Sequence, residues 1–334
     1  MNIESKILPV SVPAIAYMPW EASTLAVAMG NENIKLFIYN NYIQLGLRWI
    51  NDYHTGIPIP NLYFLDTPKG ITIRSVPYPV YFINCDDFIK NIKSLIDKEY
   101  YIYLNIDTYY IKSYSNYHNI FFLHQLLIYG YDCSGFYIAD FFSQGKYSFG
   151  YCTFEELNNA FNSALKDLSV KSWDDDLILF KVVEENIDLD IYCMINNIRC
   201  FLDSRNFSNY TENQLYDFYG IKIFEQIDKY LQLCQNNKDM VDERIFNCLY
   251  THNKLMVERI DYIYQKTNNK HLMQLSQKFK VLQNLCDLNQ NLCMKNNCKF
   301  KINTFDKIIA NFNMVRDSEY NLMLNLRFVL EELL

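Results

Sequence analysis

The 334-residue sequence lacks several features that would assign it to a common functional class. Basic residues are not in excess, since 31 Lys and Arg stand against 38 Asp and Glu and give a net charge of −7. A nucleic-acid-binding protein needs a basic face, so we expect no nucleic-acid partner. No apolar run is long enough to span a bilayer, and the first residues lack the pattern of a signal peptide. We therefore expect a cytoplasmic protein with no membrane partner.

The ten cysteines include no pair with the CxxC spacing of redox and zinc motifs. In a cytosolic protein of this size we expect free thiols, most of them packed as small apolar side chains. The trio Cys286, Cys293 and Cys298 has spacings of seven and five residues, which do not match the usual zinc sites. We predict neither a bound metal nor a cofactor.

Proline is absent after Glu184, and the pattern of apolar residues changes at the same point. Before it, short apolar runs alternate with segments of helical periodicity, which indicates mixed helices and strands. After it, apolar residues recur three and four positions apart, which predicts a bundle of five to seven helices. We predict the α+β class, with a mixed domain over residues 1–184 and an all-α domain over residues 185–334.

Local signals predict individual elements. Proline before and glycine after residues 22–29 favour a helix there, and residues 34–49 suit a second helix. Thr153 followed by Glu156 forms the capping box of a later helix. The other expected elements are a helix over 86–96, strands over 100–106 and 177–183, a β-hairpin or irregular structure over 57–80, and turns at the asparagine pairs 236–237, 268–269 and 296–297.

The clearest indication of a reactive site lies in a stretch that holds two of the five histidines. Two apolar runs, residues 125–129 and 136–139, are separated by Gly130-Tyr131-Asp132 and predict an antiparallel pair of strands. His124 precedes the first run and Asp140 follows the second, so the two side chains can meet at one end of the sheet. A carboxylate that orients a histidine base is typical of hydrolase and transferase sites. The spacing alone suits ordinary strand-edge and turn residues equally well.

The same stretch resembles a known family. Its pattern H-x5-GYD-x7-D, with DTYY ahead of it, is similar to the N-terminal domain of the butirosin biosynthesis protein H family, which belongs to the papain-like and C39-peptidase-like cysteine fold. The matching residues are Asp107-Thr108-Tyr109-Tyr110, His118, His124, Gly130-Tyr131-Asp132 and Asp140. The resemblance covers residues 15–183 and implies a papain-like fold for the first domain. Tyr219-Gly220-Ile221 resembles the start of the helical region that follows this domain in relatives.

In that fold the nucleophilic cysteine stands at the start of the first helix, where the helix dipole and a nearby histidine lower its pKa. The segment WEASTL aligns with this position, with Glu21, Ser23 and Leu25 in register. Trp20 then stands where the cysteine is expected, and no cysteine occurs before Cys85. The Cys-His mechanism of the family therefore does not transfer unchanged.

Three alternatives remain open for the chemistry. Ser23 or Thr24 replaces the cysteine, or a later cysteine such as Cys85 or Cys133 reaches the site. In the third alternative no covalent intermediate forms, and His124 acts as general base for direct attack by an amine. We assign catalytic roles to His124 and Asp140. The residues assigned to substrate binding are Trp20, Glu21, Ser23, Asp107, Tyr109 and His118.

The resemblance implies an acyltransferase of natural-product biosynthesis, which forms an amide from a carrier-bound acyl thioester and an amine. The expected partners are an acyl-carrier protein or a small-molecule or peptide substrate, and a homo-oligomer is compatible with the sequence. The acidic net charge argues mildly against an acidic carrier partner. The alternative is a pseudoenzyme, a binding or scaffold protein on the same fold, which Trp20 favours and the His124–Asp140 pair opposes. A peptidase ranks last, because a peptide bond is a poorer acyl donor than a thioester.

Overall fold

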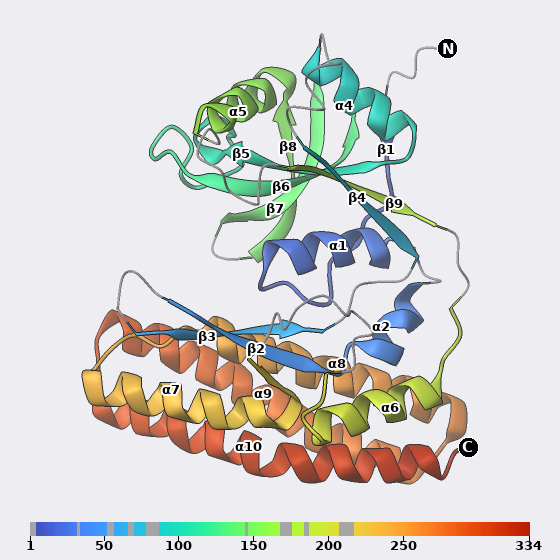
Figure 1. Ribbon diagram of the computed structural model, residues 1–334, viewed down its shortest axis with the longest axis vertical. Coiled ribbons are helices and arrows are strands. Elements are labelled where there is room, and N and C mark those ends of the chain that lie inside the picture. Colours follow the sequence, from blue (N-terminus) through green and yellow to red (C-terminus); the bar gives the residue numbers. More distant parts are fainter. Residues whose placement is uncertain are drawn as a thin grey trace. The chain divides into compact units, whose positions relative to one another are not determined.

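The computed structural model describes residues 5–31, 34–51, 57–65, 70–77, 87–143, 146–167, 176–183, 187–206 and 217–334. The chain is mixed in helix and strand, with a helical C-terminal region, which agrees with the predicted α+β class (Figure 1). It divides into two compact units. Unit 1 comprises residues 1–35 and 68–187, and unit 2 comprises residues 36–67 and 188–334.

These units differ from the predicted domains in one respect. The predicted boundary after Glu184 lies close to the crossing at Ile187, but residues 36–67 belong to unit 2 and not to the N-terminal unit. The segment contains β2 (Leu45–Ile50) and β3 (Ile59–Phe64), which pair with each other, and β2 also pairs with β10 (Phe218–Tyr219). Local patterns do not reveal a strand partner some 170 residues away, so the sequence could not show this insertion.

The helix predicted over residues 34–49 is wrong in its second half. Helix α2 (Lys35–Asn41) ends early, and β2 begins at Leu45. Since β2 has strand partners on both sides, sheet pairing overrides the helical spacing of its apolar residues. The predicted strand material over residues 57–80 is confirmed as strands, but β3 and β4 (Ile71–Pro77) lie in different sheets and form no hairpin with each other.

Unit 1 is organised on a seven-stranded antiparallel sheet in the order β4-β9-β5-β6-β7-β8, with β1 paired to β6. Its other strands are β1 (Lys6–Ile7), β5 (Tyr101–Asp107), β6 (Leu123–Tyr131), β7 (Gly135–Ser143), β8 (Lys146–Thr153) and β9 (Asp176–Val182). Helices α4 (Phe88–Asp97) and α5 (Phe154–Asp167) lie on one side of the sheet and α1 (Pro19–Met29) on the other (Figure 1). The predicted helices over 22–29 and 86–96 and the strands over 100–106 and 177–183 are confirmed.

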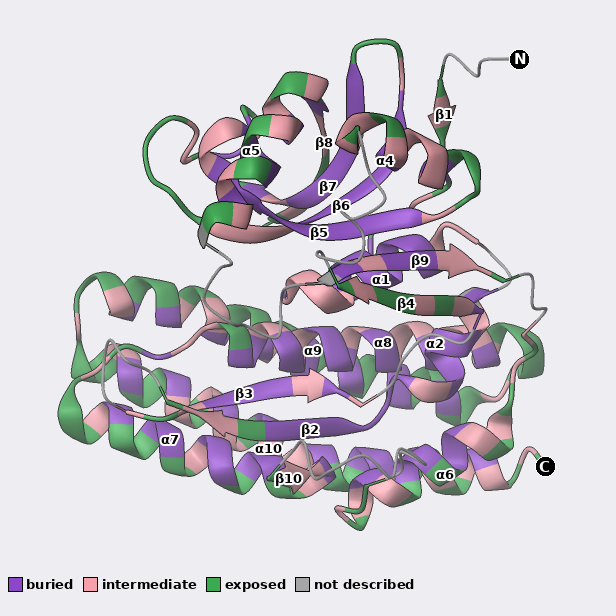
Figure 2. Cartoon of the chain, turned by 45° about the horizontal axis from the view of Figure 1, so that its top comes forward, coloured by how far each residue is buried: buried purple, intermediate pink, exposed green. Residues whose placement is uncertain are grey.

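The core of unit 1 lies between these layers. Strand β5 is buried along its whole length (Figure 2), because β6 and β9 pair with its edges and helices α4 and α5 pack against it. Its apolar side chains join those of β6, β7, α4 and α5 in one continuous cluster, to which α1 contributes Ala26 and Val27. Asp107 is the last residue of this buried strand, and His124 of β6 lies opposite Ile106 beside it.

The predicted capping box at the start of α5 is confirmed. Thr153 Oγ1 accepts a hydrogen bond from the Glu156 amide at 3.1 Å, and Glu156 Oε2 accepts one from the Thr153 amide at 2.7 Å. Replacing Thr153 with alanine should lower the free energy of unfolding by about 1 kcal/mol, because the Glu156 amide loses its partner. Thr153→Ser keeps the hydroxyl and serves as the control in urea denaturation. Equal losses in the two variants would contradict a capping role.

Residues 188–334 of unit 2 contain five α-helices in their described part, within the range of five to seven predicted for residues 185–334. They are α6 (Ile191–Leu202), α7 (Ile223–Asn237), α8 (Arg244–Thr267), α9 (Lys270–Cys298) and α10 (Ile302–Glu331). Tyr219-Gly220-Ile221 leads into α7 through a short 3-10 helix, as predicted. The turn predicted at 268–269 is confirmed, and Asn268 has the left-handed φ of 53° that asparagine tolerates well. The turn predicted at 236–237 begins one residue later, because α7 continues to Asn237 and Lys238 takes the left-handed φ of 55°.

The turn predicted at 296–297 is wrong, because α9 continues to Cys298. Asn297 instead bonds to the loop before α8, where its side chain accepts from the Val241 amide at 2.9 Å and donates to the Val241 carbonyl at 2.8 Å. Asn296 Oδ1 accepts from the Lys301 amide at 2.9 Å. These asparagines therefore hold two loops against the end of the helix.

Side chains of α8 explain why residues 36–67 belong to unit 2. Arg259 is fully buried and donates through Nε to the Tyr39 carbonyl and through Nη2 to the Tyr42 carbonyl at 2.9 Å. His252, two turns earlier, bonds to the Ile43 carbonyl at 2.9 Å. Carbonyls at the end of a helix lack intrahelical donors, so α8 supplies the donors that the end of α2 needs. His252 is itself a fully buried core residue.

Candidate functional site

The predicted strand pair that carries His124 and Asp140 is confirmed. β6 and β7 pair antiparallel with Leu127 opposite Ala139. One step further along this register Leu126 faces Asp140, and His124 lies two residues before Leu126 on the same face of the sheet. His124 Nδ1 lies 2.6 Å from Asp140 Oδ2. The arrangement expected from the sequence is therefore present in the structure.

Asp140 is fully buried and holds a fixed orientation. Its Oδ2 accepts hydrogen bonds from both the Tyr114 hydroxyl and His124 Nδ1. Its other oxygen, Oδ1, is buried without a hydrogen-bond partner among the described residues. Burial, together with the charge and hydrogen bond of Asp140, raises the pKa of Tyr114 far above 10, so the tyrosine stays a donor to the carboxylate. Asp140 is thus aligned by Tyr114 on one side and presented to His124 on the other.

His124 is the accessible member of the pair, with 22% of its side chain exposed. Burial disfavours the charged imidazolium, but the hydrogen bond and charge of Asp140, aided by a backbone hydrogen bond at Gln125, outweigh burial and raise the pKa of His124 above 6.5. Because Nδ1 donates to Asp140, the neutral ring carries its lone pair on Nε2. The ring therefore has the tautomer of a general base.

Asp107 is assigned to substrate binding, but both of its carboxylate oxygens accept hydrogen bonds from other groups of the protein. Oδ1 accepts from the Tyr109 amide at 3.0 Å and from the Phe122 amide at 3.3 Å, and Oδ2 accepts from the Ser163 hydroxyl at 2.8 Å. Phe122 in turn stacks on the His124 ring, with centroids 5.7 Å apart. Asp107 thus connects to the site indirectly, by holding the residue that covers one face of His124.

Tyr109 and His118, also assigned to substrate binding, form a separate aromatic cluster. His118 is exposed and has a left-handed φ of 54°, and its ring stacks on Tyr117 with centroids 3.9 Å apart. It also contacts the Tyr109 ring at 5.2 Å, and its amide donates to the Tyr109 carbonyl at 2.9 Å. In the described part of the chain, neither residue has a hydrogen bond or ring contact with His124 or Asp140.

Trp20 and Glu21 lie in the first turn of α1. Trp20 packs edge-on against Tyr103 and Phe180, with centroids 5.7 and 5.5 Å away. Its indole therefore belongs to the wall of the core of unit 1. Glu21 follows it, and burial raises the pKa of this carboxyl above 4.5.

The hydroxyls of Ser23 and Thr24 are both buried in α1. Ser23 Oγ accepts from the Tyr147 hydroxyl at 3.1 Å, whereas Thr24 Oγ1 donates to the Trp20 carbonyl at 2.7 Å. The pKa of Tyr147 is raised by burial and further by the charge of Asp140, so this tyrosine lies within electrostatic reach of the His124–Asp140 pair. Ser23 is therefore connected to the pair through Tyr147 and not by direct contact with His124.

No serine, threonine or cysteine side chain in the described ranges forms a hydrogen bond with His124. Cys133 lies in the turn at the far end of β6, and the seven residues from His124 to Tyr131 span roughly 20 Å of strand. Cys152 is fully buried, and burial raises the pKa of its thiol well above 9, which makes the thiol inert. Cys85, the other cysteine considered as a nucleophile, lies outside the described residues.

Sequence reasoning missed three residues of the site, namely Phe122, Tyr114 and Tyr147. Tyrosine occurs 28 times and phenylalanine 23 times, so composition gives no reason to select these three. Phe122 has one usable signal, because it belongs to the apolar run 120–123 directly before His124. Tyr114 bonds to Asp140 from a loop, and Tyr147 of β8 bonds to Ser23 of α1, and only tertiary structure shows this.

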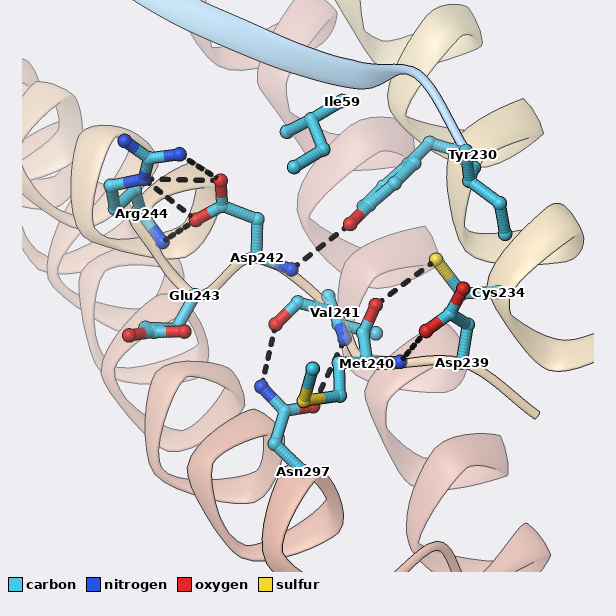
Figure 3. A pocket seen from close by; sticks show the side chains of 11 residues that line it. Ile59, Tyr230, Cys234, Asp239, Met240, Val241, Asp242, Glu243, Arg244 and Asn297 are labelled. Atoms are coloured by element: carbon cyan, nitrogen blue, oxygen red, sulfur yellow. Dashed lines mark hydrogen bonds and ion pairs between the residues drawn. The ribbon is translucent and has the colours of Figure 1, made fainter. Parts of the chain in front are cut away.

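A hollow of about 230 Å³ lies in unit 2, at the loop between α7 and α8 (Figure 3). Arg244 in this hollow is paired with Asp242, whose carboxylate accepts from Arg244 Nε at 2.9 Å, and the Asp242 amide donates to the Tyr230 hydroxyl at 3.0 Å. None of the residues assigned to catalysis or substrate binding lines it. We therefore regard the His124–Asp140 pair as the candidate site.

A scan against protein-family models and a search of curated proteins both found no match to this chain. Within the described ranges, His, Cys, Asp and Glu side chains form no group of three or more that could hold a metal ion. None of the helices described is long and apolar enough to cross a membrane. The geometry around His124 is therefore the basis for assigning a function.

Proposed function

We propose that this protein is an amide-forming acyltransferase in which His124 is the general base. An amine attacks the carbonyl carbon of an acyl thioester, a C–N bond forms, and the C–S bond breaks. His124 Nε2 accepts the proton that the amine loses, and the departing thiolate takes up a proton to leave as a thiol. The family resemblance adds three further points to the proposal. An acyl-carrier protein is the thioester donor, the first domain has a papain-like fold, and the protein acts in natural-product biosynthesis.

The observation that carries the proposal is the hydrogen bond between His124 Nδ1 and the buried Asp140. It leaves Nε2 as the basic nitrogen of a partly exposed imidazole, which is the atom a general base needs. Of the three alternatives for the chemistry, this geometry favours direct attack, because no hydroxyl or thiol of the described residues bonds to His124. An amine is a sufficient nucleophile toward a thioester once its proton has an acceptor.

The test is amide formation from N-acetylcysteamine acyl thioesters and a panel of amines, followed by mass spectrometry of product and intact protein. We expect the wild type to form amide without a stable acyl adduct, and His124→Gln to lose roughly 10²- to 10⁴-fold in rate. His271→Gln, which changes an exposed histidine at the start of α9, should keep the full rate. An acyl adduct on the protein would overturn direct transfer, and equal rates in the wild type and His124→Gln would overturn the role of the base.

A second candidate function is a non-catalytic binding protein, and Trp20 is the observation that favours it. The indole fills the nucleophile position and packs against Tyr103 and Phe180, as a residue selected for packing would. This candidate predicts ligand binding with no amide product from any donor in the panel. It also predicts that His124→Gln leaves the affinity for the ligand nearly unchanged.

A further inference from the structure

The loop ahead of His124 exposes three large apolar side chains in succession. Ile120 is 59%, Phe121 48% and Phe122 54% exposed. In the part of the chain that the structure describes, no other consecutive large apolar residues are exposed to this extent. Exposed apolar surface of this kind usually has a binding role, because leaving it in water is unfavourable. We call residues 120–122 the apolar triplet.

The backbone of the apolar triplet is held in place by polar groups. The Phe122 amide donates to Asp107 Oδ1 at 3.3 Å, and the Phe122 carbonyl accepts from the amide and the hydroxyl of Thr108 at 3.0 and 3.1 Å. Asn116 Nδ2 donates to Thr108 Oγ1 at 2.6 Å and to the Ile120 carbonyl at 3.4 Å. Asp107 is itself anchored to Ser163 of α5. The apolar side chains therefore project from a fixed backbone, which reduces the entropy lost when a ligand binds.

The apolar triplet is continuous with the candidate site. The Phe122 ring stacks on the His124 ring, with centroids 5.7 Å apart and planes inclined by 25°. A group bound with its reactive carbon at His124 therefore has the Phe122 ring beside it. The segment from Ser113 to Tyr131 contains no Asp, Glu, Lys or Arg, so it places no carboxylate, ammonium or guanidinium group of its own beside the apolar triplet. An uncharged, apolar occupant matches it and a charged one does not.

We propose that the apolar triplet binds the acyl chain of the donor, and that this chain is apolar and uncharged. The inference rests on the acyltransferase function proposed above and specifies the class of its substrate. The thioester carbonyl lies at His124 Nε2, and the acyl chain extends over Phe122 toward Ile120.

The test measures binding separately from chemistry. Unreactive alkyl thioethers of N-acetylcysteamine, with chains of two to ten carbons, are titrated into the full-length protein by calorimetry. Each methylene buried on the apolar triplet should lower the Kd about fourfold. Phe122→Ser should flatten this dependence on chain length, whereas Phe328→Ser, which changes a similarly exposed phenylalanine of α10, should preserve it. Circular dichroism of both variants checks that they fold.

Two results would overturn the inference. One is a Kd that does not change with chain length in the wild type, or that changes equally in Phe122→Ser. The other is a wild-type dimer in analytical ultracentrifugation that Phe122→Ser converts to a monomer, because the apolar triplet would then be an interface between copies of the chain. The outcomes for the two proposals are distinct. Amide formation without chain-length dependence contradicts only the apolar substrate, and chain-length dependence without amide formation contradicts only the catalytic function.

Discussion

Replacing Asp140 with asparagine is expected to move the pKa of His124 from above 6.5 to below it. Burial of the imidazole lowers its pKa, and only the interactions with Asp140 and the backbone at Gln125 reverse that effect. Asparagine keeps the size of Asp140 but removes its negative charge, so burial should prevail. The proposed base would then lack the carboxylate that orients it, and the rate of amide formation at neutral pH should fall by a factor of at least about ten. NMR titration of the histidine ring resonances measures the pKa directly.

The same substitution should reverse the effect of pH on stability at this site. In the wild type the folded-state pKa of His124 is raised, so the pair adds stability that is fully present below pH 6.5. That contribution is lost as pH rises through the folded-state pKa. In Asp140→Asn the folded-state pKa lies below the unfolded value, so stability is instead lost as pH falls below 6.5. At pH 6 we expect Asp140→Asn to cost about 3 kcal/mol, because the buried pair loses its anion.

Asp132→Asn is the matched control for Asp140→Asn, since Asp132 lies at the opposite end of the same strand pair. It accepts from the Ser134 and Gly135 amides in the turn and has no hydrogen bond to His124. This variant should leave the His124 pKa unchanged. A His124 pKa that stays above 6.5 in Asp140→Asn would show that groups other than Asp140 hold the proton.

A buried acid in unit 2 should make the protein less stable at alkaline pH. Glu319 of α10 is fully buried, and its polar neighbours include the Asn253 side chain and the His252 ring. Burial raises its pKa to about 8, and the neighbouring Asn253 amide offsets this only in part. His252 Nδ1 lies 3.4 Å away, and burial lowers the pKa of this histidine to about 3. At neutral pH both side chains are therefore uncharged.

The neutral forms of this pair are chemically consistent. His252 Nε2 must donate to the Ile43 carbonyl, so Nδ1 carries a lone pair that faces the Glu319 carboxyl. A protonated carboxyl is a donor and suits this lone pair, whereas a carboxylate would place a negative charge beside it in a dry core. The interaction with Ile43 thus selects the imidazole tautomer that tolerates a buried carboxylic acid.

Glu319→Gln should remove the loss of stability that occurs as pH rises from about 4.5 to about 8. In the wild type the folded state holds the Glu319 proton from about pH 4.5 to about pH 8, so stability falls as pH rises through this window. The penalty is complete above pH 8 and amounts to something on the order of 4 kcal/mol. Glutamine has nearly the same shape and an amide donor for His252, but no proton to lose. We expect urea denaturation at pH 5 to 9 to show that the free energy of unfolding of Glu319→Gln, relative to that of the wild type, increases with pH up to about 8.

His252 supplies an internal reference for this experiment. Because the pKa of His252 is lowered, the wild type loses stability as pH falls from 6.5 toward 3. The same loss at acid pH should be seen in Glu319→Gln. Glu225→Gln, which changes an exposed glutamate of α7, should follow the wild-type curve. A pH profile of Glu319→Gln parallel to that of the wild type would mean that Glu319 is already ionised at pH 5.

Short-range patterns in the sequence were enough to determine several parts of this protein. The two apolar runs and the turn between Tyr129 and Phe136 predicted the strand pair that brings His124 to Asp140. The Thr153 capping box involves groups only three residues apart, and the helical spacing after Glu184 predicted the bundle. Each of these depends on neighbours along the chain, which the sequence displays directly.

Tertiary structure decided what depends on distant partners. Residues 36–67 belong to unit 2 because α8 supplies donors to the end of α2 and because β10 pairs with β2. Phe122 covers His124 because Asp107 and Thr108 hold its backbone, and Glu319 retains its proton because the bundle excludes water around it. Burial and long-range hydrogen bonds are properties of the whole packed chain. No local pattern of residues determines which side chains will share a dry environment, and it is that environment that sets the charge of His124, His252 and Glu319.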